Sequence, residues 1–109
     1  MARLTRQEVK VILETATELD FSNDDLRDID LHKLELCGAN FTNVDLGYAD
    51  LSEADLTDAV FVGANLSHTN LRGANLRRAN FENANAWSTN LSHCLLKQAL
   101  FVNANMSGS

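Results

Sequence analysis

Large apolar residues recur at every fifth position through most of the chain. The series consists of Phe, Leu and a final Met, and it is interrupted only by Ala86: Phe21, Leu26, Leu31, Leu36, Phe41, Leu46, Leu51, Leu56, Phe61, Leu66, Leu71, Leu76, Phe81, Leu91, Leu96, Phe101 and Met106. A helix repeats every 3.6 residues and a strand every second residue, so a period of five belongs to neither and indicates an internal repeat. Residues 19–106 are therefore predicted to form a solenoid.

The other positions of each five-residue unit follow a pattern as well. The residue two positions before the apolar centre is small in most units, and the residue just before the centre is usually Asp or Asn. The two residues after the centre are mostly polar. In a locally extended chain alternate residues share a face, so the small residue and the centre both point inward. Asp, Asn, Ser, Thr and Gly supply the chemistry of the turns between the sides of the solenoid.

A second period comes from the phenylalanines, which occur at intervals of twenty residues: Phe21, Phe41, Phe61, Phe81 and Phe101. Twenty residues are four units, so a coil with four sides would stack these rings at the inter-strand spacing of about 4.8 Å. A coil with three or five sides would scatter them. The phenylalanines are thus the predicted structural core of an all-β solenoid with about four and a half coils.

The N-terminal segment has a helical pattern instead. Thr5 and Glu8 have the spacing of a capping box, and the apolar residues that follow share one helical face over residues 5–18. We expect this helix to cover the first coil, because the end of a solenoid otherwise exposes its core. The predicted organisation is a capping helix in 1–18, the repeat in 19–106 and a tail in 107–109.

The repeat unit resembles that of a known family. ADLSE at 49–53, ANLSH at 64–68 and ANLRR at 74–78 are similar to the A(D/N)LXX unit of the pentapeptide repeat family, and the resemblance extends over about residues 19–106. It implies a right-handed quadrilateral β-helix, here with an N-terminal α-helical cap. It also implies one functional alternative, because some members of this family are acidic, dimeric DNA mimics that bind DNA gyrase and confer quinolone resistance.

Charge is distributed unevenly along the repeat. The net charge of −6 argues against nucleic acid as a direct ligand. In a twenty-residue coil Asp25 lies under Asp45, Asp30 under Asp50, and Glu35 under Asp55, whereas later units carry Asn at these positions. One interpretation is that Asp and Asn are interchangeable turn formers. The other is an acidic interaction face for a basic partner, formed by Asp25, Asp30, Asp45, Asp50 and Asp55.

Outward apolar residues gather late in the chain. Leu95, Leu100 and Val102 fall in the last full coil, and they are the candidate C-terminal interface. No capping segment follows Met106, so we expect either a homodimer formed through this coil or the docking of an unidentified protein partner. A loose polar tail that shields the end is the alternative.

The sequence offers little for catalysis. His32, His68 and His93 are not separated by multiples of twenty, and no cluster of them with cysteine or carboxylate is expected at metal-ligand spacing. A filled interior would leave no concave site, so catalysis and cofactors are not expected. Without a signal peptide or membrane segment, the expected location is the cytosol. The sequence predicts a non-enzymatic binding or scaffold protein. A gyrase-binding DNA mimic and a structural protein with no specific partner are the alternatives.

Overall fold

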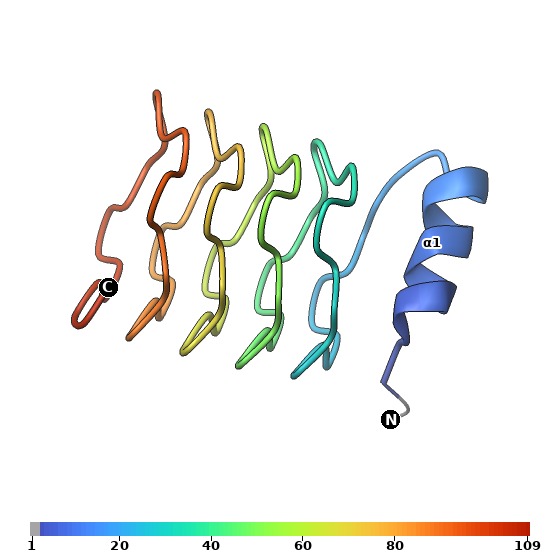
Figure 1. Cartoon of the computed structure of the whole chain (residues 1–109), viewed down its shortest axis with the longest axis horizontal. Coiled ribbons are helices and arrows are strands. Elements are labelled where there is room, and N and C mark those ends of the chain that lie inside the picture. The colour runs from blue at the N-terminus through green and yellow to red at the C-terminus, as the bar shows by residue number, and fades with distance from the viewer. Residues whose placement is uncertain (1–2) are drawn as a thin grey trace.

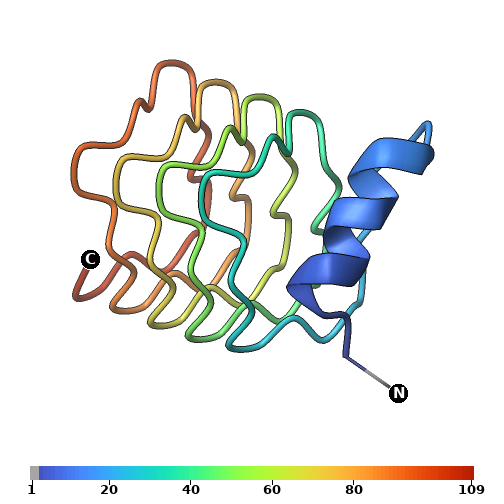
Figure 2. The same ribbon diagram turned by 45° about the vertical axis from the view of Figure 1, so that its right-hand side comes forward.

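The protein is a short helix followed by a stack of similar coils. The structure, a computed structural model, describes residues 3–109. Helix α1 (Arg6–Thr15) lies across one end of the stack, and the C-terminus lies at the other end (Figures 1 and 2). The molecule measures 34 × 27 × 19 Å. No helix within residues 3–109 is long and apolar enough to cross a membrane.

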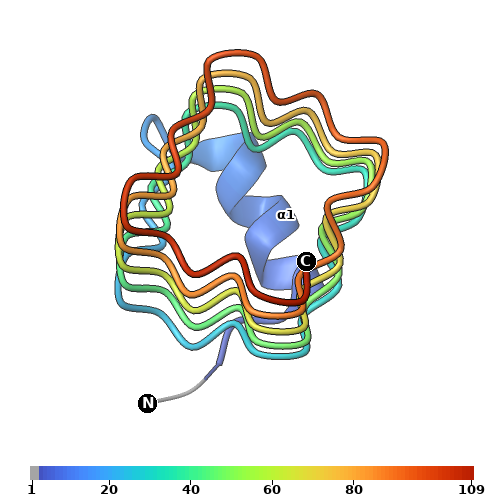
Figure 3. The same ribbon diagram turned by 90° about the vertical axis from the view of Figure 1, so that its left-hand side faces the viewer.

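The coils are joined by parallel β-bridges between residues twenty positions apart. Bridges recur at every fifth residue, from Asp20–Asn40 to Asn85–Asn105, and in residues 3–109 they remain isolated bridges without extending into longer strands. Each centre from Phe21 to Ala86 donates its N–H to the next coil, as Phe41 does to the Val60 carbonyl at 2.7 Å. A bridge every five residues in a circuit of twenty gives each coil four sides, and the coils superpose when viewed along the stack (Figure 3).

Every corner contains a residue in the left-handed region. The last residue of each unit has a φ between 55° and 74°, from Asn23 to Gly108. Asn and Gly tolerate this conformation, whereas a β-branched or bulky residue is strained in it. This explains why Asn and Gly occupy many of these positions. Bulky residues also occur in this conformation, among them Lys33, Tyr48 and Arg78, with φ of 62°, 61° and 58°.

Phenylalanine rings form a continuous column inside the stack. Phe21, Phe41, Phe61 and Phe81 are at most 1% exposed. Neighbouring rings, including Phe101 in the last coil, lie 4.8 to 5.3 Å apart with interplanar angles of 4° to 14°. Leucine columns and small inward residues fill the rest of the interior. The twenty-residue period aligns identical side chains, so each ring meets the same shape in the next coil.

Two buried threonines replace alanine at the small inward position. The hydroxyls of Thr69 and Thr89 donate to the Leu46 and Leu66 carbonyl oxygens of the preceding coil, at 2.8 and 2.6 Å. Cys94 occupies the equivalent position on the adjacent side, and burial raises the pKa of its thiol. A buried hydroxyl is tolerated inside the coil because a carbonyl oxygen lies within hydrogen-bond distance of it.

Helix α1 begins as the sequence predicts but ends earlier. Thr5 and Glu8 form the capping box, with hydrogen bonds of 3.2 and 3.0 Å between the side chain of each and the backbone N–H of the other. Val9 is completely buried against the core. The expectation of a helix reaching residue 18 is wrong, because Ala16 is already extended. The chain must turn here, since the Leu19 carbonyl already accepts from Asn40 of the next coil.

Candidate functional site

The Asp and Asn residues that precede the apolar centres all make the same turn. In each case the side-chain oxygen Oδ1 accepts a hydrogen bond of 2.9 to 3.2 Å from the backbone N–H two residues later. The residues are Asp20, Asp25, Asp30, Asn40, Asp45, Asp50, Asp55, Asn65, Asn70, Asn75, Asn80, Asn85, Asn90 and Asn105. Carboxylate and amide oxygens perform this task equally, which supports the interpretation of Asp and Asn as interchangeable turn formers.

The first acidic column is partly neutralised by an arginine. Arg27 donates from Nε and Nη2 to the two carboxylate oxygens of Asp25, both at 2.9 Å, and its Nε lies 3.7 Å from Asp45. Hydrogen bonds from Arg27 hold the pKa of Asp25 well below its usual range. The stacked carboxylates are therefore not a bare acidic strip, because a guanidinium offsets the repulsion between them.

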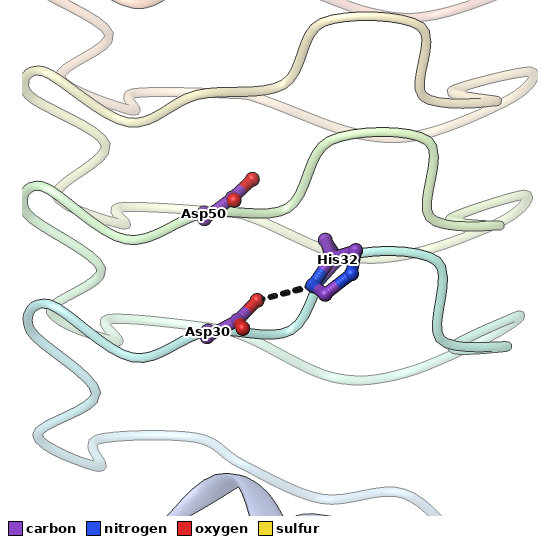
Figure 4. Close-up of side chains that lie close together, drawn as sticks. All are labelled: Asp30, His32 and Asp50. Atoms are coloured by element: carbon purple, nitrogen blue, oxygen red, sulfur yellow. Dashed lines mark hydrogen bonds and ion pairs between the residues drawn. The ribbon is translucent and has the colours of Figure 1, made fainter.

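Asp30 and His32 lie on one coil, and Asp50 lies beside them on the next coil (Figure 4). His32 Nδ1 lies 2.6 Å from Asp30 Oδ1, and one ligand atom each from Asp30, His32 and Asp50 lies within 4.8 Å of the others. The Arg6 guanidinium lies 3.4 Å from the same Asp30 oxygen and donates to the Asp30 and His32 carbonyl oxygens. Hydrogen bonds from His32 lower the pKa of Asp30 below its usual value.

The expectation that no histidine clusters with a carboxylate at metal-ligand spacing is wrong, because stacking of the coils brings Asp50 beside Asp30 and His32. Combining the two-residue spacing of Asp30 and His32 with the twenty-residue spacing of Asp30 and Asp50 would have found this cluster. Carboxylates and imidazole are donors that a divalent cation accepts. However, Arg6 and the ring of His32 already use the Asp30 oxygen, so the contacts present attach α1 to the first coil.

A group of aromatic side chains lies on the outer surface. The Tyr48 and His68 rings stack at 4.6 Å with an interplanar angle of 12°, and the Trp87 ring meets the His68 ring edge-on at 4.7 Å. Tyr48 is 64% exposed and Trp87 is 45% exposed. We call these three residues the aromatic ladder. The sequence analysis did not group them, although the twenty-residue spacing of Tyr48 and His68 was a signal.

The candidate C-terminal interface is exposed. Leu95, Leu100 and Val102 keep 46%, 54% and 56% of their surface in solvent, and we call them the last-coil patch. Leu95 and Leu100 stand just before their centres, at the position where fourteen other units carry a turn-forming Asp or Asn. All three point away from the interior. Their exposure therefore comes from their place in the unit.

Comparisons with known proteins agree on the repeat. The family model described as "Pentapeptide repeat region" matches residues 36–109. No curated protein sequence matches the chain. Among solved structures, QnrB1, a plasmid-mediated fluoroquinolone resistance protein, has a TM-score of 0.68 and 23% identity over 82% of this chain and 46% of its own.

Two further solved structures have higher identity. The protein alr5209 of Nostoc PCC 7120 is 35% identical over 88% of this chain and 73% of its own, with a TM-score of 0.45. A thylakoid-lumen protein of Arabidopsis thaliana is 33% identical over 82% of this chain, with a TM-score of 0.40. The chain spans 46% of QnrB1 and 61% of the Arabidopsis protein. All three are pentapeptide repeat proteins, the group known for right-handed quadrilateral β-helices. With the family model matching most of its length, this chain belongs to the pentapeptide repeat family.

Proposed function

We propose that the protein is a non-enzymatic binding or scaffold protein, and that the last-coil patch docks onto another protein. The observation that carries this proposal is the exposure of Leu95, Leu100 and Val102 in a repeat whose rules favour polar residues there. At Leu95 and Leu100 the chain gives up the turn bond that Asp or Asn would make. Local folding gains nothing from these leucines, whereas a docking surface does.

The patch suits a macromolecule better than a small ligand. The side chains that fill the middle of the stack are buried, so the interior offers no room for a substrate. Small molecules are usually held in concave sites, and the patch lies on the outside of a coil. Removing the exposed half of each side chain from water would contribute roughly 1 kcal/mol. Three such residues can anchor an interface that a polar rim completes.

The first version to test is association with a second copy of this chain. Sedimentation equilibrium across a concentration series should show a dimer for the unaltered protein. The variant Leu95→Asn/Leu100→Asn should be monomeric, because Asn restores the turn bond and removes the apolar surface. A matched control is Val62→Thr, which removes a half-buried outward valine elsewhere. If the unaltered protein stays monomeric at the highest concentration, the self-association version is wrong.

We infer a right-handed β-helix of about four and a half coils over 19–106, capped by α1 and followed by a tail in 107–109. Burial of Val9 and the hydrogen bonds from Arg6 support the capping role. A protein without residues 1–18 should unfold at a lower temperature, because the first coil would lose that cover. An unchanged unfolding temperature would contradict the capping role.

The second candidate is the acidic DNA mimic. It is favoured by the likeness in fold to QnrB1, whose own description is that of a fluoroquinolone resistance protein. The candidate acidic face would be the surface involved: Asp25, Asp30, Asp45, Asp50 and Asp55. Against it stand the turn bonds of all five residues and the pairing of Asp25 with Arg27. In a gyrase supercoiling assay, inhibition or protection at micromolar protein would support mimicry, and no effect would set it aside.

A structural protein with no specific partner is the third alternative. It would show neither self-association nor any effect on gyrase, so the two assays above separate it from the other candidates. The cytosolic location stays a prediction.

A further inference from the structure

Folding does not require aromatic side chains at the positions of the aromatic ladder. Tyr48 and His68 occupy the left-handed corner position, where the same side of other coils carries Asp28, Ser88 and Gly108. A tyrosine gains no turn bond there, and 64% of it faces solvent. Exposed aromatic side chains that gather at one place typically mark a recognition surface.

The Tyr48 ring stacks on His68, and 64% of the Tyr48 surface remains in solvent. His68 covers one face of the Tyr48 ring, since the two rings are nearly parallel at 4.6 Å. Asp28 holds the equivalent corner twenty residues earlier, in the preceding coil. The Asp28 N–H donates to the Gly47 carbonyl at 2.9 Å, which places the two corners side by side. The short Asp28 side chain keeps 69% of its surface in solvent.

The exposed Tyr48 ring and the carboxylate of Asp28 both favour a cation. An aromatic face is electron-rich and attracts a cation placed over it. Asp28 adds a carboxylate on the same side. Asp45 follows on the neighbouring column with 39% of its side chain exposed, but Arg27 lies 3.7 Å from it and offsets its charge in part. The nearest internal cation, Arg3, lies 3.7 Å from Asp28 and also contacts Asp25 and the Arg27 carbonyl oxygen. Asp28 thus retains capacity for a second partner.

We propose that this surface binds a basic segment of a partner protein, with an arginine side chain stacked on Tyr48 and paired with Asp28. A planar guanidinium can stack on a ring and bond to a carboxylate at the same time, whereas a lysine ammonium cannot stack. Nucleic acid is disfavoured, because its phosphates would approach Asp28 and Asp45. The ladder shares no residue with the last-coil patch. The inference therefore goes beyond the proposed docking and does not depend on self-association.

Trp87 makes the proposal directly measurable. It is the only tryptophan of the chain and contacts His68, which stacks on Tyr48, so we expect its fluorescence to respond when a ligand binds at Tyr48. The probe is a synthetic peptide of alternating Arg and Gly, and the control peptide carries Lys in place of Arg. The Arg peptide should change the Trp87 emission and bind roughly three- to tenfold more tightly than the Lys peptide, since stacking adds to charge.

Two variants separate stacking from charge. Tyr48→Asn should weaken binding of the Arg peptide roughly three- to tenfold and remove its advantage over the Lys peptide. Asn already occupies the corner position at 23, 43, 83 and 103, so this variant should fold. Asp28→Asn should weaken both peptides roughly two- to fivefold. Glu82→Gln makes the same change in net charge on another side and should have little effect.

The outcomes against the proposal are equally definite. Equal binding of the Arg and Lys peptides would mean that charge alone attracts them, and it would overturn the stacking role of Tyr48. Unchanged binding in Tyr48→Asn, with a native circular dichroism spectrum, would do the same. Tighter binding of the neutral sugar maltoheptaose than of the Arg peptide would overturn the basic partner. None of these results bears on dimerisation through the last-coil patch.

Discussion

The first and last coils follow the same repeat but treat their outer positions differently. Early units place Asp before the centre and surround it with Arg3, Arg6 and Arg27, whose ion pairs tie α1 and the coils together. Late units place Asn or Leu there instead, and Leu95 and Leu100 remain exposed. The repeat needs only a turn former at this position. Any further property of the side chain at this position, such as its charge or its apolar surface, is therefore available for contacts with other residues or with a partner.

The packing of the interior also differs between the middle coils and the last coil. Phe61 has a stacked ring on both sides, at 5.0 and 4.8 Å, whereas Phe101 has only Phe81, at 4.9 Å. Phe61 is fully buried and Phe101 is partly buried. The inner rings of such a column contribute most to stability, because each of them is buried between two identical neighbours.

The largest expected effect tests this difference. Phe61→Ala should lower the free energy of unfolding by about 3 to 5 kcal/mol, because it leaves a cavity inside the column. Phe101→Ala should cost roughly 1 to 2 kcal/mol, since less surface is buried there. Urea denaturation of the two variants measures both. Equal losses would contradict the view that the last coil is the weaker part.

A smaller effect concerns the inward hydroxyls. Thr69→Val keeps the shape of the side chain but removes its hydrogen bond to the Leu46 carbonyl, and we expect a loss of about 1 kcal/mol. That carbonyl keeps its bond from Ala49, which limits the cost. Cys94→Ala should cost less, because a thiol is a weak donor and Cys94 is half-buried. A larger loss from Cys94→Ala in thermal unfolding would reverse this ranking.

The acid response should also separate the two regions. Arg27 lowers the pKa of Asp25 in the folded protein, so this carboxylate stabilises the fold above its unfolded pKa of about 3.9 and loses that contribution as the pH falls. Arg27→Gln raises the folded pKa toward the normal value. Its unfolding temperature should then decline less steeply below about pH 4 than that of the unaltered protein.

The control for the acid response is Arg77→Gln in a later coil. Among residues 3–109 the Arg77 guanidinium makes no ion pair, so its loss should leave the acid profile unchanged. NMR titration of the Asp25 carboxyl carbon follows the pKa directly. A normal pKa for Asp25 in the unaltered protein would show that the Arg27 contact does not persist in solution.

The period of twenty residues could be read from the sequence because it depends on identical side chains at fixed intervals. The phenylalanines were sufficient to align the coils, and Thr5 with Glu8 was sufficient to begin α1. The end of α1 was not predictable, because it depends on where Leu19 first pairs with Asn40. Tyr48 and His68 share one position of the unit and could have been paired by their spacing, whereas the contact of Trp87 with His68 and the contacts of Arg6 join different positions. Such contacts require the actual path of the corners.

The smallest expected effect decides between the two interpretations of the acidic columns. Asp45 accepts a hydrogen bond of 3.0 Å from the Gly47 N–H, and the amide oxygen of Asp45→Asn can accept the same bond. We therefore expect stability to change by less than about 0.5 kcal/mol. Leu95→Asn should gain about 0.5 to 1 kcal/mol from a new turn bond. Chemical denaturation of both variants provides the comparison. A loss above about 1 kcal/mol in Asp45→Asn would mean that the charge itself, through Arg27, stabilises the early coils. A loss below about 0.5 kcal/mol would mean that folding requires only an oxygen at this position. The Asp45 carboxylate would then be free for a basic partner.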